Sequence, residues 1–188
     1  MAVRLLGIDT GWVATGFALV DWCCGTPTTI QAARTCHTEP TPKQRRESEV
    51  IDHQRRMGEI SRATDSALAD FHPDMVVVEA LSLGAPNVRS LVVQALGYAA
   101  VMCSCIRAGV AVRQVAPADV RRALDVQPRK GWTQEQKKAA VKAAVLRYVL
   151  APSCATEHEW DAAAAALACL VPTPLDLVLA VQAGRAAS

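Results

Sequence analysis

The sequence has few of the features that mark secreted, disulfide-bonded or disordered proteins. Its seven cysteines are odd in number and include no Cys-x-x-Cys pair, which argues against a disulfide scaffold or a zinc site. Aromatic residues make up 4% of the chain, so the core must be built mainly from aliphatic side chains. Apolar residues reach 51%, which excludes disorder by composition. A length of 188 residues fits one globular domain. The cysteines are expected to be reduced.

Long uncharged apolar runs are also missing. The N-terminal apolar run meets Asp9 too early to form the core of a signal peptide, and the apolar piece 91–106 is shorter than a membrane span. We therefore expect a cytoplasmic protein with no membrane segment. The net charge of +2 excludes a generally basic protein, but residues 117–150 hold eight Lys or Arg against three Asp or Glu. The chain thus contains one basic segment and is slightly acidic elsewhere.

Apolar periodicity predicts alternating strands and helices. Strands are predicted at 3–9, 15–22 and 28–36, the first two as a hairpin around a tight glycine-containing turn. A helix over about 45–71, a strand at 74–79, a helix over 88–107 and a strand at 110–115 follow. Helices near 117–124, 134–150 and 157–170 complete the prediction. A mixed five-stranded α/β sheet with helices on both faces satisfies the hairpin and the right-handed crossovers.

Two acidic residues end predicted strands. Asp9 ends the first strand, and Glu79 ends the fourth. If these strands are parallel neighbours, both carboxylates emerge at the sheet edge where open α/β sheets bind ligands. Two close carboxylates repel one another and are poorly solvated when buried, so a cation between them resolves the conflict. For oxygen ligands near a phosphate, Mg²⁺ is the default ion.

The stretch EHEWDAAAAALACL adds a third acidic position. Its alanines predict a helix that packs closely on a sheet. His158 and Asp161 are three residues apart and Glu157 and Asp161 are four apart, so either pair can face the same way. Acidic residues at a helix start also cap the helix and complement its dipole without any other function. Taken with Asp9 and Glu79, the pattern favours a shared site.

Three segments, in this order and spacing, resemble one family. GIDTGWVATG near the start, VVVEA after a long helix and HEWDAAAAAL near the end are similar to the RuvC-type Holliday junction resolvases of the RNase H-like superfamily. The resemblance assigns residues 1–171 to a nuclease domain and leaves 172–188 as a C-terminal tail. GIDxG alone also begins sugar kinases and actin-like ATPases, but these need a second related domain. The resemblance implies an RNase H-like fold with strand order 3-2-1-4-5.

The resemblance also implies an activity and a site. The family cuts four-way DNA junctions by paired symmetric nicks that leave 5′-phosphates. Its catalytic set, which binds two divalent metal ions, falls on Asp9, Glu79, His158 and Asp161, with His158 preferred to Glu157 because of the H-x-x-D spacing. Two Mg²⁺ ions, for which Mn²⁺ can substitute, activate water and stabilise the leaving oxygen. The implied partners are branched DNA, a second copy of the chain in a homodimer, and a branch-migration helicase.

Further residues are implied as DNA contacts. Basic side chains before the catalytic helix are expected on phosphates, which makes affinity fall steeply with salt; they are Arg121, Arg122, Lys130, Lys137, Lys138 and Lys142. In the loop after Glu79, Leu81 and Leu83 are expected to help open the junction centre, with Asn87 and Arg89 on the backbone. The two leucines can equally cover the sheet edge. The helix over 88–107 can supply either a dimer interface or core.

The sequence departs from the family at the candidate site. Thr10 stands where the family usually has proline, Trp12 follows where smaller or polar residues are frequent, and the loop after Glu79 is about one residue longer. These differences leave the metal site intact but bear on junction selectivity. The alternative is a RuvC-like nuclease that acts mainly on forks, flaps or other branched DNA.

Overall fold

A mixed β-sheet forms the centre of the computed structural model, which describes residues 2–23, 28–43, 48–81, 87–150 and 154–170. Antiparallel pairing joins β1 to β2 and β2 to β3, while β4 runs parallel to both β1 and β5. These strands are β1 (Ala2–Asp9), β2 (Ala14–Cys23), β3 (Thr28–His37), β4 (Met75–Glu79) and β5 (Ala111–Val115). The predicted five-stranded sheet of order 3-2-1-4-5 is therefore confirmed. The prediction of a separate tail at 172–188 lies outside the described residues.

A short sixth strand extends this sheet and corrects the sequence prediction. The helix predicted over 134–150 ends at Tyr148, and β6 (Val149–Leu150) pairs parallel with the start of β3. The full order is β5-β4-β1-β2-β3-β6. The change follows from Val149, whose backbone is extended and whose side chain is buried against the core.

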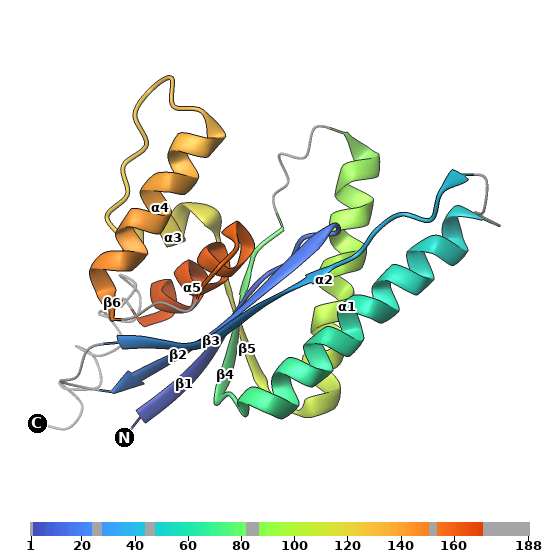
Figure 1. Cartoon of the computed structure of the whole chain (residues 1–188), viewed down its shortest axis with the longest axis horizontal. Helices are drawn as coiled ribbons and strands as arrows, with labels where there is room; N and C mark the ends of the chain where they lie inside the picture. Colours follow the sequence, from blue (N-terminus) through green and yellow to red (C-terminus); the bar gives the residue numbers. More distant parts are fainter. Residues whose placement is uncertain (1, 24–27, 44–47, 82–86, 151–153, 171–188) are drawn as a thin grey trace, which may run out of the picture.

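In the described part of the chain, five helices cover the two faces of the sheet (Figure 1). Their bounds are α1 (Glu49–Phe71), α2 (Val88–Ala108), α3 (Pro117–Ala123), α4 (Gln134–Tyr148) and α5 (Glu157–Leu170). The pair α1 and α2 packs on one face, and α3, α4 and α5 lie on the other. Ser48 caps α1 by accepting a hydrogen bond from Ile51 N, so the described helix begins later than the predicted residue 45.

Each face of the sheet has its own hydrophobic core. Because side chains alternate along a strand, Leu5 of β1 packs towards α5, whereas Leu6 and Ile8 pack towards α1 and α2. β4 alternates in the same way, with Val77 on one side and its two neighbouring valines on the other. Both faces of β1 and β4 are thus covered. This double burial explains why their sequences are almost wholly apolar until the terminal carboxylate.

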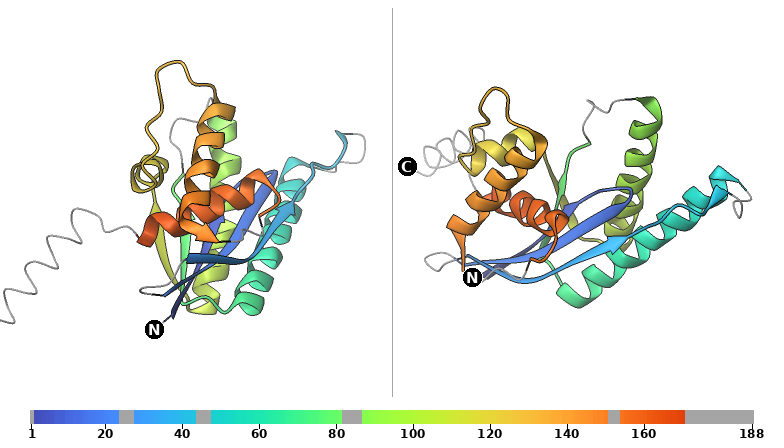
Figure 2. Two further views of the ribbon diagram at one scale, coloured as in Figure 1. Left: turned by 60° about the vertical axis from the view of Figure 1, so that its left-hand side comes forward. Right: turned by 45° about the horizontal axis from the view of Figure 1, so that its top comes forward.

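Helix α5 crosses the strands beneath it (Figure 2), and its backbone approaches theirs closely. Its alanines at 162–166 are all buried. The strands present glycine under the helix: a Cβ atom at Gly7 would lie 1.9 Å from the carbonyl oxygen of Ala162, and one at Gly16 would lie 2.1 Å from that of His158. Small side chains on both sides therefore let α5 cross β1 and β2 in backbone contact. This contact carries His158 and Asp161 to the end of β1.

Helix α2 is the element that bears on the expectation of no membrane segment. In the described part of the chain it is the one helix that is long and apolar enough to cross a bilayer, judged by length and composition. Its residues Gly97, Ala100, Val101 and Cys105 are buried in the core with α1. Core helices of this kind pass the same test of length and composition, so the expectation of no membrane segment stays a prediction.

Candidate active site

A cavity of about 630 Å³ opens where the carboxyl ends of β1 and β4 meet the start of α5. Ile8 of β1 pairs with Val78 of β4, so Asp9 and Glu79 follow at the same level of two neighbouring parallel strands. His158 and Asp161 line the same cavity from α5. The structure therefore brings together the four residues that the sequence nominated as catalytic. Their convergence follows from the parallel β1–β4 pairing and from the close seat of α5.

Direct contacts link these side chains. His158 Nδ1 lies 2.7 Å from Asp9 Oδ2, with both side chains partly buried. Asp161 Oδ2 lies 3.9 Å from Lys138 Nζ of α4, and Glu157 forms an ion pair with the same lysine. His158 thus faces the strand carboxylate, while Glu157 turns towards α4. The i, i+3 pair of His158 and Asp161 is the one that lines the cavity.

The cluster carries unbalanced negative charge. Burial, together with repulsion from Asp9 and Asp161, raises the pKa of Glu79 to about 7. Burial and the Asp9 charge raise the pKa of Asp161 to about 6. The hydrogen bond that the His158 ring donates to the Asp9 carboxylate, against an opposing effect of burial, raises the pKa of His158. A proton or another cation is thus strongly favoured in this cavity.

This donor set fits a divalent cation. Three carboxylates and an imidazole are oxygen and nitrogen ligands that Mg²⁺ and Mn²⁺ accept, and the raised carboxyl pKa values identify them as under-compensated. Across residues 2–23, 28–43, 48–81, 87–150 and 154–170, no three His, Cys, Asp or Glu side chains already stand in a closed metal-binding group. Asp9, Glu79, His158 and Asp161 all line one cavity and are the residues that would hold a cation there.

Three of the predicted DNA-binding residues line the cavity: Arg121 of α3 and Lys137 and Lys138 of α4. Arg121 and Lys138 are close enough to Glu79 to oppose the rise of its pKa. Arg121, Lys137 and Lys138, here called the basic rim, share the cavity with the carboxylates. Their positive charge would offset the repulsion between those carboxylates and a DNA phosphate. Lys142 lies further along α4, where its ammonium sits 5.0 Å from the ring centroid of Trp160.

The other predicted contacts lie elsewhere or have structural partners. Arg122 is exposed and pairs with Asp119, Arg89 pairs with Glu49, and Lys130 is exposed in the loop before α4. Asn87 caps α2, its Oδ1 atom accepting a hydrogen bond 2.8 Å from Ser90 N. None of these four side chains lines the cavity among the residues described. Leu81 is half-buried and borders a smaller pocket next to Glu79, and Leu83 lies outside the described residues.

Several lining residues were not predicted from the sequence. Ser90 and Gln94 face the cavity from α2, and Trp12 forms part of its wall. The signal for the first two was present, because they are polar residues four positions apart in a mainly apolar helix. Trp12 gave no such signal, since its position depends on contacts with a distant helix.

A buried glutamate fixes the start of α5 between the two site residues. Glu159, 5% exposed, accepts hydrogen bonds from Thr35 Oγ1 at 2.9 Å, Ala155 N at 2.6 Å and Thr156 N at 3.2 Å. Thr156 Oγ1 in turn accepts a hydrogen bond from Glu159 N, which completes a capping box. Capping is the alternative role that the sequence offers for the acids at this helix start, and Glu159 does cap. His158 and Asp161 flank it and line the cavity.

The fold and the acidic cluster together define an RNase H-like protein. The chain belongs to the RuvC family, because the family model described as "Crossover junction endodeoxyribonuclease RuvC" matches residues 5–170. It is 31% identical to the protein of that name from Halorhodospira halophila over 166 residues, which are 87% of each chain. It is 30% identical to that from Alkalilimnicola ehrlichii, over 87% of this chain and 88% of the relative. The match to the Thermobifida fusca relative covers 62% of that protein.

Solved structures show the same fold. The T. thermophilus RuvC in complex with a Holliday junction substrate superposes with a TM-score of 0.67 at 21% identity, covering 89% of this chain and 92% of that one. The yeast mitochondrial Holliday junction resolvase Ydc2 gives a TM-score of 0.55 at 12% identity, covering 88% and 75%. At these identities the solved structures establish the fold alone. Membership of the family rests on the family model that matches residues 5–170.

Proposed function

We propose that the chain is a metal-dependent endonuclease that resolves four-way DNA junctions by paired symmetric nicks and leaves 5′-phosphates. One observation carries the proposal: Asp9, Glu79, His158 and Asp161 converge in one cavity of a RuvC-family chain. The basic rim above the carboxylates supports a nucleic-acid substrate. We propose that the protein acts on DNA in the cytoplasm. Family membership also suggests a branch-migration helicase as a partner.

The four side chains have distinct proposed roles. Asp9, Glu79 and Asp161 would hold two divalent cations, with His158 as a further ligand. Bound cations supply a hydroxide nucleophile at neutral pH and stabilise charge on the leaving oxygen. His158 Nδ1 is held by Asp9, so the ring is oriented at the cavity, and the other nitrogen of the neutral imidazole would be the ligand atom.

DNA would enter along the basic rim. We propose that Arg121, Lys137 and Lys138 bind the phosphates nearest the cut, because these three basic side chains line the cavity. Arg122, Lys130 and Lys142 would contact phosphates further away. Lys138 would exchange its ion pairs with Glu157 and Asp161 for a phosphate as the strand arrives. The half-buried Leu81 is proposed at the junction centre with Leu83, and Asn87 and Arg89 at the flanking backbone.

A substrate panel tests the proposal. Purified protein with Mg²⁺ would be given an end-labelled four-way junction, a fork, a flap, a single strand and a linear duplex of shared sequence. We expect paired nicks at symmetric positions on the junction, and products that ligase can reseal because they carry 5′-phosphates. Stronger cleavage of the fork or flap would move the function to the alternative nuclease. Absence of cleavage on every substrate in Mg²⁺ and Mn²⁺ would refute the nuclease assignment.

Cleavage at limiting Mg²⁺ is expected to fall as the pH falls from 8 to 6. A raised pKa means that Glu79, near 7, and Asp161, near 6, take up protons in this range, whereas ordinary carboxyls stay ionised. Protons and cations then compete for the same oxygens. The Mg²⁺ concentration at half-maximal rate should therefore rise as the pH is lowered, and saturating Mg²⁺ should recover much of the rate. A half-maximal concentration that is constant between pH 6 and 8 would contradict this expectation.

Symmetric nicking requires two active sites, and we propose that α2 supplies the dimer interface. Val88, Val92 and Ile106 are 77%, 47% and 72% exposed and lie on the outer side of a helix whose other side is in the core. An apolar face repeated by two-fold symmetry is self-complementary. Helix α2 also borders the cavity through Gln94, so such an interface would couple the two active sites.

The double variant Val92→Glu/Ile106→Glu is expected to convert the dimer to a monomer, because two carboxylates would be buried on each side of the interface. Sedimentation velocity measures the change in mass. Single nicks should persist while coordinated pairs are lost. Leu146→Glu is the matched control, since Leu146 is an exposed leucine of α4 on the opposite face of the sheet. A dimer that survives the double change would place the interface elsewhere.

A further inference from the structure

The turn between β1 and β2 forms one wall of the active-site cavity. Residues 10–13 follow Asp9 directly, and all four line the cavity. Within the turn, Gly11 N donates to Asp9 O at 3.2 Å and Thr15 Oγ1 donates to Gly11 O at 2.9 Å. The turn is also held from outside by Thr38 at the end of β3, whose N–H donates to Val13 O at 2.8 Å. Its shape therefore depends on residues far from it in sequence.

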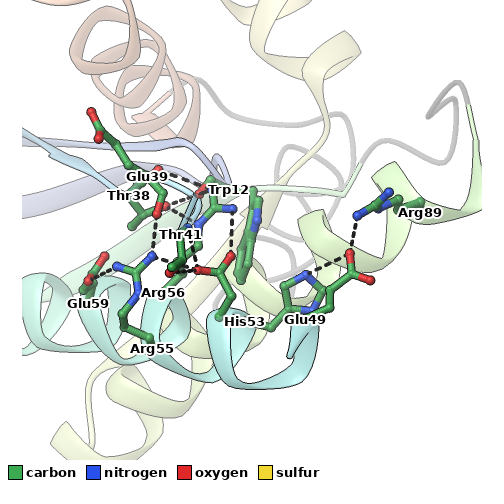
Figure 3. Close-up of polar contacts among 11 residues, drawn as sticks. Trp12, Thr38, Glu39, Thr41, Glu49, His53, Arg55, Arg56, Glu59 and Arg89 are labelled. Atoms are coloured by element: carbon green, nitrogen blue, oxygen red, sulfur yellow. Dashed lines mark hydrogen bonds and ion pairs between the residues drawn. The ribbon is translucent and has the colours of Figure 1, made fainter. Parts of the chain in front are cut away.

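Arg56 of α1 is the centre of this outer support (Figure 3). Its guanidinium donates from Nη2 to Trp12 O at 3.0 Å and from Nε to Thr38 Oγ1 at 3.1 Å, and Thr38 Oγ1 donates to Trp12 O at 2.5 Å. The same guanidinium lies 4.5 Å from the centroid of the Trp12 ring. Arg56 thus holds Trp12 both by its carbonyl and by its ring, and it is 5% exposed.

A second layer fixes Arg56 itself. Asp52, one turn earlier on α1 and 4% exposed, has Oδ2 at 4.0 Å from Arg56 Nη1. Its Oδ1 accepts hydrogen bonds from Thr41 N at 2.9 Å, Thr41 Oγ1 at 2.7 Å and Arg55 Nη2 at 3.0 Å. Burial favours the neutral form, but these hydrogen bonds outweigh it and hold the pKa of Asp52 well below its ordinary value. The partner of Arg56 is therefore ionised throughout the neutral range.

The chemistry of the contact requires a guanidinium. One planar group serves two acceptors through different nitrogens and presents a face to an indole, which the point charge of a lysine cannot do. A buried ion pair is weak evidence for stability, because apolar residues of similar volume commonly replace it at little cost. Stability is therefore a poor explanation for the buried Arg56. Its hydrogen bond to the Trp12 carbonyl is better explained by the conformation that it gives to the turn.

We infer that Arg56 is a positioning residue for the proposed nuclease reaction. It holds the turn at residues 10–13 so that Asp9 and the Trp12 wall keep the geometry needed by the scissile strand. The inference rests on the proposed function for its effect on cleavage, and it deepens that function by assigning a control element outside the carboxylate cluster. Trp12, a departure from the family pattern, is the side chain through which Arg56 acts.

The test compares Arg56→Met and Arg56→Lys with Arg107→Met. Arg107 is the control for loss of an arginine that pairs with an acidic side chain, because it binds Asp65 of α1 from α2 at the exposed surface and does not line the cavity. Three quantities are measured: the single-turnover cleavage rate of the four-way junction, the junction Kd in Ca²⁺, and amide hydrogen exchange of peptides covering residues 9–16. Thermal unfolding is followed in parallel, and Thr38→Val provides a second variant that removes the bridging hydroxyl.

Both Arg56 variants are expected to exchange faster at residues 9–16 and to cleave about a hundredfold more slowly, with the junction Kd within threefold and Arg107→Met unchanged. If Arg56→Met does not fold, Thr38→Val decides, and it should show the same pattern more weakly. Unchanged exchange at residues 9–16 would overturn the inference whatever happens to cleavage, as would wild-type cleavage by Arg56→Lys. Failure of the wild type to cleave any junction would refute the proposed function, and the exchange data alone would then decide whether Arg56 holds the turn.

Discussion

Asp9→Asn is expected to lower the cleavage rate by roughly a thousandfold or more while leaving junction binding almost unchanged. If Asp9 is a cation ligand, as proposed, its loss would remove several kcal/mol of transition-state stabilisation, and about 4 kcal/mol corresponds to a thousandfold. The phosphate contacts proposed for Arg121, Lys137 and Lys138 do not involve Asp9. The single-turnover rate should therefore fall, and the Kd for the junction should stay within about threefold.

The same variant is expected to keep or raise the folding stability. Asp9 repels the carboxylates of Glu79 and Asp161 and contributes to the raised pKa of each. An amide of the same shape removes that repulsion and still has a hydrogen-bonding atom to offer to His158. Urea unfolding should therefore show an unchanged or higher free energy of unfolding for Asp9→Asn, together with lower pKa values for the two remaining carboxyls.

Asp65→Asn is the control for loss of one negative charge. Asp65 pairs with Arg107 and does not line the cavity. We expect it to cleave at the wild-type rate. Wild-type cleavage by Asp9→Asn would remove Asp9 from the catalytic set, and equal losses in both variants would show that overall charge, not the site, controls the rate.

Most of the site could be predicted because it depends on strand ends and helix spacing. Asp9 and Glu79 each end an apolar run, and parallel strands bring their carboxyl ends to one edge of a sheet. The alanine run of α5 predicted close packing on the sheet, and the glycines at 7 and 16 complete it. Each of these local patterns is compatible with one arrangement of the sheet and α5, so the order and the pairing of the elements were both predictable.

The parts that were missed depend on tertiary contacts or on very short elements. β6 has two residues, too few for any periodicity. Arg56 is one of several arginines in a polar helix, and nothing local distinguishes it from the exposed Arg55. Arg89 and Arg122 were predicted as DNA contacts from the family resemblance, and that stays a prediction; their ion-pair partners, Glu49 and Asp119, could not be read from the sequence and are visible only in the folded chain. Sequence patterns thus predict the elements and their order, but not which side chains pair with one another in the folded chain.

Gly16→Ala is expected to lower the free energy of unfolding by about 3 kcal/mol or more and the cleavage rate by about a hundredfold. A Cβ atom at residue 16 would lie 2.1 Å from the His158 carbonyl oxygen and 2.8 Å from its Cβ atom. Overpacking a close contact typically costs 1–3 kcal/mol, and here the obstacle is helix backbone, which cannot rotate away. The first turn of α5 must move from β2, and His158 then loses its 2.7 Å contact with Asp9.

Gly58→Ala separates this effect from the general cost of replacing glycine. The nearest atom to a Cβ at residue 58 is Arg62 Nη1 at 3.5 Å, an ordinary contact with a flexible side chain. In the middle of α1, alanine should raise the free energy of unfolding by up to about 1 kcal/mol. Urea unfolding and single-turnover cleavage measure both variants. If Gly16→Ala retained wild-type stability and rate, α5 would have room above β2, and close packing could not be what sets His158 against Asp9.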